Sequence, residues 1–207
     1  MSQSARHIDG TTGAGAPAAG SAGEHQPARS LSAWIAAIAL LCGTGALLAA
    51  GQSQVEEYRL KAAFLFHFAQ FVEWPANALP DAGGALVFCV LGDDPFHGDL
   101  EGTVLGKFAA GRPVRILHIQ QVQPASGCHL VFLDRKQSGR ARELLASLNN
   151  APVLTVGESE DFLRQGGMIR FCMDERKVRF EINQGAAERA HLKISARLLL
   201  LAKSVIG

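Results

Sequence analysis

The sequence predicts a single α/β domain: a mainly parallel sheet flanked by helices, followed by a C-terminal β-hairpin and helix. Between residues 85 and 164, short runs of consecutive apolar residues alternate with segments of helical pattern. Such runs are typical of parallel strands buried on both faces. After Gly166-Gly167, two runs of alternating polarity flank a polar triplet, which is the pattern of a hairpin. We find no internal repeat or linker that would divide residues 52–207.

A helix is predicted over residues 55–74, because apolar side chains recur there at steps of three and four. They form one stripe, made of Leu60, Phe64, Phe68 and Phe71. Pro75 ends this helix, since a residue that precedes proline is disfavoured in the α region.

Strands and helices then alternate along the chain. The predicted strands cover residues 85–91, 113–119, 128–133 and 152–156. The predicted helices cover residues 96–105, 138–148 and 160–164, the last two capped by Ser138 and Ser159. The hairpin strands are residues 168–174 and 178–183, and helices follow at 186–190 and 195–206. The run of leucines at 198–201 predicts that the last helix is buried on most sides.

The N-terminal residues have the composition of a targeting region. Residues 1–30 are rich in small and polar residues, and we expect them to be disordered. Residues 31–51 form a charge-free apolar stretch that ends in Ala49-Ala50-Gly51, as in a signal peptide that is cleaved on export. An uncleaved membrane anchor is the alternative, because twenty apolar residues can span a bilayer. The exported domain would then comprise residues 52–207 and lie in the periplasm.

The charge balance excludes one broad class of function. The 207-residue chain has a formal net charge of +1. The first 51 residues carry two basic and two acidic side chains, so the remainder is also nearly neutral. Nucleic-acid binding domains show a strong basic excess, and we therefore predict no nucleic-acid partner.

The cysteines suggest one disulfide. Cys89 and Cys128 lie in apolar runs that are predicted to be strands, and an exported domain meets an oxidising environment. A bond between them would stabilise the fold by roughly 4 kcal/mol in the chain-entropy model. The alternative is two buried thiols that pack as small hydrophobic groups. Cys172 is left over, either as a free thiol or as a link to another chain.

Two groups of polar residues are candidate sites. Asp93 and Asp94 follow the first predicted strand and Asp134 follows the third, at the edge where open α/β sheets place ligands. They predict a pocket for a small molecule, although Asp-Asp-Pro is equally suited to a turn. The second group is a possible partner-binding face: Arg179, Glu181 and Asn183 on one side of the second hairpin strand, with Arg189 nearby.

Motifs of the common enzyme classes are missing from the sequence. It contains no G-x-S-x-G elbow, no C-x-x-C pair, no phosphate-binding glycine loop and no helical histidine pair of the zinc hydrolases. We therefore predict no catalytic residues, no metal ligands and no cofactor. A protein that acts by binding is the expectation that remains.

Several segments, taken in order, are similar to one family. The stretches YRLKAAFL at 58–65 and FVEWP at 71–75 resemble the opening of the YfiR family of periplasmic proteins. The later stretches VLTV at 153–156, GGMI at 166–169, KVRFEIN at 177–183 and LKIS at 192–195 are also similar. The resemblance covers residues 55–205.

The resemblance implies a periplasmic repressor. Such a protein binds the periplasmic domain of a membrane-anchored diguanylate cyclase, holds it inactive and so lowers cyclic di-GMP. An outer-membrane lipoprotein can sequester the repressor and release the cyclase. The resemblance also implies a disulfide at Cys89 and Cys128, whereas Cys172 lacks the partner needed for the second disulfide of some members. We expect a homodimer.

Overall fold

The computed structural model describes residues 53–79 and 84–207. The predictions of disorder over residues 1–30 and of a signal peptide over residues 31–51 fall outside this part of the chain. Among the described residues, none of the helices combines the length and the apolar character needed to cross a bilayer.

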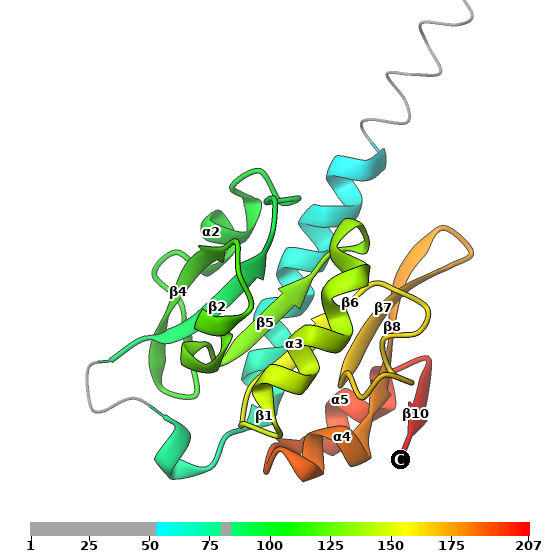
Figure 1. The fold of residues 1–207 in the computed structure, drawn as a ribbon. Coiled ribbons are helices and arrows are strands. Elements are labelled where there is room, and N and C mark those ends of the chain that lie inside the picture. Colours follow the sequence, from blue (N-terminus) through cyan, green and yellow to red (C-terminus); the bar gives the residue numbers. More distant parts are fainter. Residues whose placement is uncertain (1–52, 80–83) are drawn as a thin grey trace, which may run out of the picture. The chain divides into compact units, whose positions relative to one another are not determined.

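The described residues form one eight-stranded sheet in the order β10-β8-β7-β6-β5-β2-β4-β3. Neighbouring strands are parallel except in two hairpins, β3–β4 and β7–β8. The mainly parallel sheet and the C-terminal hairpin are thus confirmed (Figure 1). The strands are β2 (Leu86–Leu91), β3 (Phe108–Ala109), β4 (Arg112–Ile119), β5 (Leu130–Leu133), β6 (Leu154–Gly157), β7 (Ile169–Asp174), β8 (Lys177–Asn183) and β10 (Ser204–Ile206).

Helices cover both faces of the sheet, as predicted. The first helix, residues 53–71, lies behind the sheet in Figure 1, and α3 (Ala141–Leu148) lies in front. Alternate residues of the central strands point to opposite faces of the sheet. Phe88 and Val90 pack toward the first helix, whereas Leu91 packs toward α3. This two-sided burial explains why the strands read as unbroken apolar runs. The shorter helices are η1 (Ala76–Ala78), α2 (Asp99–Val104), η2 (Gln123–Gly127), η3 (Arg135–Arg140), α4 (Gln184–Arg189) and α5 (Ala196–Leu201).

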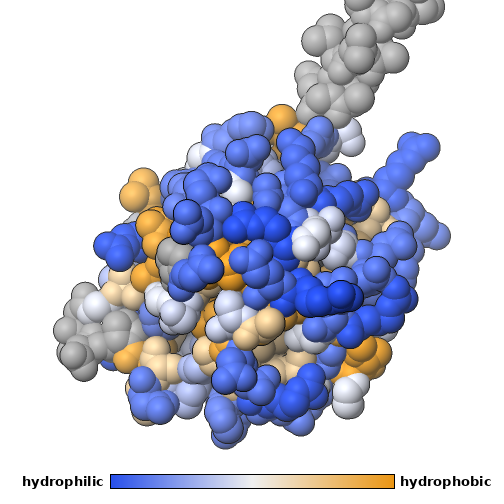
Figure 2. Space-filling model, in the orientation of Figure 1, coloured by the Kyte–Doolittle hydropathy of each residue, from blue (hydrophilic) through white to orange (hydrophobic). Residues whose placement is uncertain are grey.

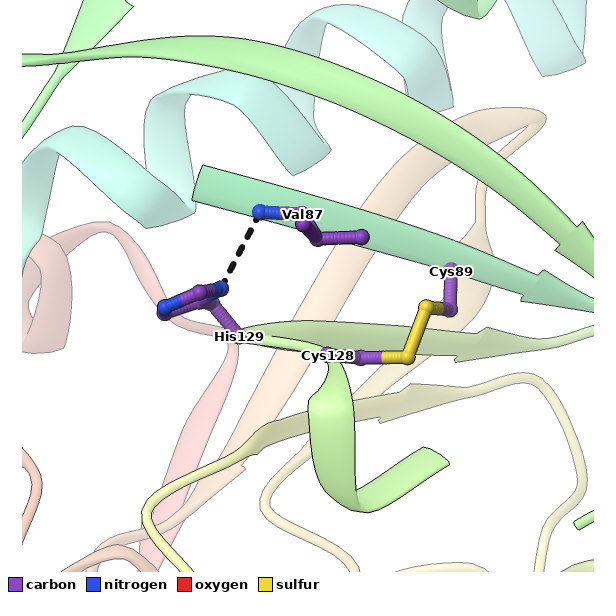
Figure 3. Close-up of a disulfide and its surroundings, with 4 residues drawn as sticks. All are labelled: Val87, Cys89, Cys128 and His129. Carbon is purple, nitrogen blue, oxygen red and sulfur yellow. Dashed lines mark hydrogen bonds between the residues drawn. A yellow bond between two sulfur atoms is a disulfide. The ribbon is translucent and has the colours of Figure 1, made fainter. Parts of the chain in front are cut away.

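The predicted disulfide joins Cys89 to Cys128, with their Cα atoms 5.9 Å apart. Cys89 lies in β2 and Cys128 precedes the neighbouring strand β5. The next residue, His129, also connects the two strands. Its ring Nδ1 accepts a hydrogen bond from the Val87 backbone N–H at 3.0 Å (Figure 3). The His129 backbone N–H donates to the Val87 carbonyl at 2.8 Å. Burial lowers the pKa of His129, which favours the neutral imidazole that this bond requires.

The first helix ends three residues earlier than predicted. It stops at residue 71, and Val72–Glu73 form strand β1, which pairs antiparallel with β9 (Lys193–Ile194). The Phe71 carbonyl accepts a hydrogen bond from the Ser195 N–H at 2.9 Å, so a distant segment satisfies the end of the helix. The pattern of apolar residues around Val72 cannot predict this pairing, because the partner strand is distant in the sequence.

Two further helix predictions are wrong: one helix begins at another residue, and one is absent. Asp134, and not Ser138, caps the helical segment, because its carboxylate accepts the Gln137 N–H at 3.0 Å and a 3₁₀ turn precedes α3. Residues 160–166 form turns instead of a helix. There the fully buried ring of Phe162 lies directly over Gly157 and Gly167, where a Cβ atom would collide with it. The chain therefore wraps tightly around this ring.

The predicted last helix is shorter and more exposed than expected. It ends at Leu201, after which β10 adds parallel to β8 at the edge of the sheet. The Lys203 N–H donates to the Phe180 carbonyl at 2.7 Å, which draws the chain out of the helix and onto the sheet. Leu198 is buried, but Leu200 and Leu201 are 85% and 60% exposed, so the expectation of burial on most sides is wrong.

Candidate functional site

The ends of three adjacent parallel strands bring together the aspartates predicted to form a pocket. Asp93 and Asp94 follow β2, and Asp134 follows β5. Glu158 follows β6, the strand next to β5, and lies at the same edge of the sheet as the aspartates. These side chains share one edge because parallel strands all end on the same side of a sheet.

The first helix supplies the opposite wall of this site. Lys61 is buried and pairs with Glu158, with Nζ 2.5 Å from Oε1 and side-chain exposures of 5% and 2%. Lys61 also pairs with Glu57, one turn earlier on the helix. The Glu158 Oε2 accepts hydrogen bonds from the Tyr58 hydroxyl at 3.1 Å and from the Arg135 N–H at 3.0 Å. These donors compensate the Glu158 carboxylate for its loss of contact with water.

Tyr58 is held as a neutral donor in this group. Its burial, and secondly the adjacent Glu158 carboxylate, raise the pKa of the phenol well above its usual range. The Lys61 Nζ lies 4.3 Å from the centre of the Tyr58 ring, and the ring also contacts Phe96 edge-on. Tyr58, Lys61 and Glu158 therefore form a fixed polar floor.

The aspartates have local structural roles as well. Asp94 accepts the N–H groups of Phe96 and Gly98 at 2.8 and 3.3 Å, so the turn that its sequence predicted is present. Asp134 caps η3 through Oδ1 and is only 4% exposed. Burial raises the pKa of Asp134, and the nearby Glu158 and Asp93 add to this effect. Asp93 is exposed.

A cavity of about 690 Å³ is lined in part by Tyr58, Lys61 and Glu158. Its volume is within the range of small-molecule sites. The wall combines charged side chains with a few apolar ones. It is made of Gln54, Val55, Glu57, Tyr58, Lys61, Asp93, Asp94, Pro95, His97, Asp134, Arg135, Lys136, Glu158 and Met173. All three predicted pocket aspartates are among these residues.

One set of side chains has the composition of a metal site. Asp94, Glu101 and His118 each place one donor atom within 4.8 Å of the others. The His118 Nε2 and Glu101 Oε1 are already hydrogen-bonded at 2.7 Å. Two carboxylates and an imidazole can hold a divalent cation. The mutual hydrogen bond also explains the arrangement of Glu101 and His118 without one.

The predicted partner-binding residues are distributed over two environments. Glu181 is mostly buried and accepts a bidentate contact from Arg170, with Nη2 2.6 Å and Nε 2.9 Å from Oε2. Asn183 is buried; its Oδ1 caps α4 at the Ala186 N–H. Arg189 is exposed, and Arg179 is partly so. Both arginines are therefore accessible from solvent, whereas Glu181 and Asn183 are occupied within the fold.

Exposed apolar side chains gather in the C-terminal segment, next to this face. Leu200, Leu201, Val205 and Ile206 are 42–85% exposed. Strand β10 extends along β8, with Ser204 opposite Glu181. By contrast, Figure 2 shows hydrophobic residues dispersed in small groups among hydrophilic ones on the face around α3. A sheet edge with apolar neighbours is a common feature of protein contact surfaces.

The sequence reasoning missed Tyr58, Lys61 and Glu158 as parts of the site. Glu158 follows a buried strand just as Asp134 does, so the strand-end rule applied to it equally. For Lys61 the helical pattern held no such signal, because its partner Glu158 lies 97 positions away.

Fold and site together define a small α/β domain with a charged cavity and an exposed sheet edge. The chain matches the model of the YfiR/HmsC-like family over residues 58–203 and belongs to that family. This family comprises periplasmic regulators of cyclic di-GMP signalling and is regulatory rather than catalytic.

Two solved structures are similar to part of this chain. A conserved domain protein from Vibrio cholerae O1 biovar eltor is 13% identical, with a TM-score of 0.46 over 62% of this chain and 56% of that one. The ABC domain in complex with L-Trp from Streptococcus pneumonia is 11% identical, with a TM-score of 0.44 over 58% and 55%. The chain thus spans about half the length of these structures. No curated protein matches the sequence.

Proposed function

We propose that this protein is a periplasmic binding protein that represses a membrane-anchored diguanylate cyclase and so lowers cyclic di-GMP. The observation that carries the proposal is the family match over residues 58–203, nearly all of the described domain. The protein acts by binding and not by catalysis: its greater affinity for the inactive state of the cyclase shifts the cyclase population toward that state.

The hairpin face is the proposed contact surface for the cyclase. Arg179 and Arg189 supply accessible positive charge, and the adjacent β10 supplies exposed apolar side chains and a free sheet edge. Glu181 and Asn183 support this face from within, through Arg170 and α4. In the same proposal the protein is a homodimer, and an outer-membrane lipoprotein that competes for the surface releases the cyclase.

Co-purification from membranes tests the proposed interaction. An affinity-tagged chain should retain a diguanylate cyclase. Arg189→Glu should retain much less of it, because a charge reversal at a contact weakens association. Arg115→Glu is the matched control and should behave like the wild type, because Arg115 is an exposed residue of β4, near the other end of the strand order from β8 and β10. If the wild type retains no cyclase, the proposed function is wrong; if Arg189→Glu retains as much as Arg115→Glu, the proposed surface is wrong.

A second candidate function is the binding of a small molecule at the strand ends. The cavity of about 690 Å³ with Asp93, Asp94 and Asp134 in its wall favours it. A ligand that binds only the folded protein raises the melting temperature, so a thermal-shift screen tests this function. The two functions are compatible, because the cavity and the hairpin face use different predicted residues.

A further inference from the structure

We propose that the cavity at the strand ends binds a small molecule that carries an ammonium group on a short apolar chain, with Asp134 as its counter-ion. This inference rests on the second candidate function and names the class of ligand. It is independent of cyclase repression.

Asp134 is the side chain in the cavity wall that is best placed to bind a cation. It is 4% exposed, and its Oδ1 accepts the Gln137 N–H at 3.0 Å. In the described part of the chain, no lysine or arginine forms an ion pair with Asp134. The other carboxylate oxygen, Oδ2, is not among the buried atoms that lack a partner, so it is reached from the cavity, where an ammonium group can bind it through a charge-assisted hydrogen bond.

The nearby cations of the protein are committed or point to solvent. Lys61 is held by ion pairs with Glu57 and Glu158. Arg135 and Lys136 are exposed at the rim. Lys136 favours the charged form of Asp134, but its exposed ammonium group is screened by water and forms no ion pair with that carboxylate. The interior of the cavity is therefore left with the negative charge of Asp134, supported by Asp93 and Asp94 at its edge.

Apolar groups in the wall define the rest of the ligand. Val55, Pro95 and Met173 line the cavity beside the charged residues. Val55 and Met173 are about half exposed, 55% and 45%, so a ligand chain that covers them gains apolar contact. The combination of one buried carboxylate and a partly open apolar wall fits an alkylamine better than an anion or a neutral polar molecule.

Isothermal titration with three probes of the same length tests the proposal: pentylamine, 1-pentanol and pentanoate. The purified protein should bind pentylamine and should bind the other two at least tenfold more weakly. Asp134→Asn keeps an acceptor for the Gln137 N–H but removes the charge, and it should weaken pentylamine at least tenfold. Glu143→Gln, an acidic residue of α3 outside the cavity wall, is the matched control and should bind like the wild type.

The outcomes separate the two levels of the argument. Binding of pentanol or pentanoate as tightly as pentylamine would overturn the ligand class but keep a small-molecule site. If no probe binds, both the ligand class and the second candidate function are overturned. Equal affinity of Asp134→Asn and Glu143→Gln for pentylamine would overturn the role of Asp134. Should Asp134→Asn fold poorly, the wild type still decides, because pentylamine affinity must fall as acid protonates Asp134.

Discussion

The buried pair of Lys61 and Glu158 supports a quantitative prediction. Replacing Lys61 by Met removes the cation from a site where Glu158 is 2% exposed. Removing one partner of a buried pair costs about 3–5 kcal/mol. Glu158 keeps its donors from Tyr58 and Arg135, so we expect the lower end, about 3 kcal/mol. With a urea slope of about 2 kcal/mol/M, the unfolding midpoint should fall by roughly 1.5 M.

Two further variants make this prediction specific. The double variant Lys61→Met with Glu158→Gln removes both charges and keeps an acceptor for Tyr58, so it should recover to within about 1 kcal/mol of the wild type. Arg164→Met removes an ion pair with Asp161 in which the two side chains are 76% and 54% exposed. This change should lower the free energy of unfolding by at most about 1 kcal/mol. Urea denaturation followed by circular dichroism measures all three. If Lys61→Met destabilises the protein no more than Arg164→Met does, the buried pair contributes no more to stability than an exposed one.

Three other predictions concern the cysteines and a histidine. Replacing both Cys89 and Cys128 by Ala should lower the free energy of unfolding by about 4 kcal/mol, measured in urea; a loss below about 1 kcal/mol would contradict the chain-entropy argument. Burial lowers the pKa of His129 in the folded state, so the unfolded state takes up the proton first and stability falls as the pH drops below about 6.5. His129→Asn keeps an acceptor for the Val87 N–H and should lose less stability than the wild type between pH 7 and pH 5. An equal loss in the two proteins would show that His129 is not the cause. Burial raises the pKa of Cys172, so iodoacetamide should label this thiol more slowly in the folded than in the urea-unfolded protein, and equal rates would show that it is not shielded.

Local patterns predicted the central sheet because its strands are buried on both faces. The runs around Cys89 and Cys128 indicated neighbouring strands, and the disulfide confirmed that they are adjacent. The convergence of Asp93 and Asp134 followed from the same rule, since parallel strands end on one side. These features depend on topology that short sequence patterns encode.

Features set by distant pairing could not be predicted in this way. Residues 195–206 have a helical pattern throughout, yet Val205 pairs with Ile182 in the sheet and the helix stops at Leu201. Likewise, the pattern of the first helix did not reveal that Val72 leaves the helix to pair with Ile194. In each case a backbone hydrogen bond to a remote segment outweighs the local helical preference.

Repression of a diguanylate cyclase by this protein would be visible in the cellular level of cyclic di-GMP. This level should be measured in the bacterium that carries this gene, in a strain that lacks the gene, and in that strain complemented with either the wild type or Arg189→Glu. Loss of the gene should raise cyclic di-GMP, the wild type should restore the low level, and Arg189→Glu should restore it less. An unchanged level of cyclic di-GMP on loss of the gene, in cells where the cyclase is present, would contradict repression by this protein.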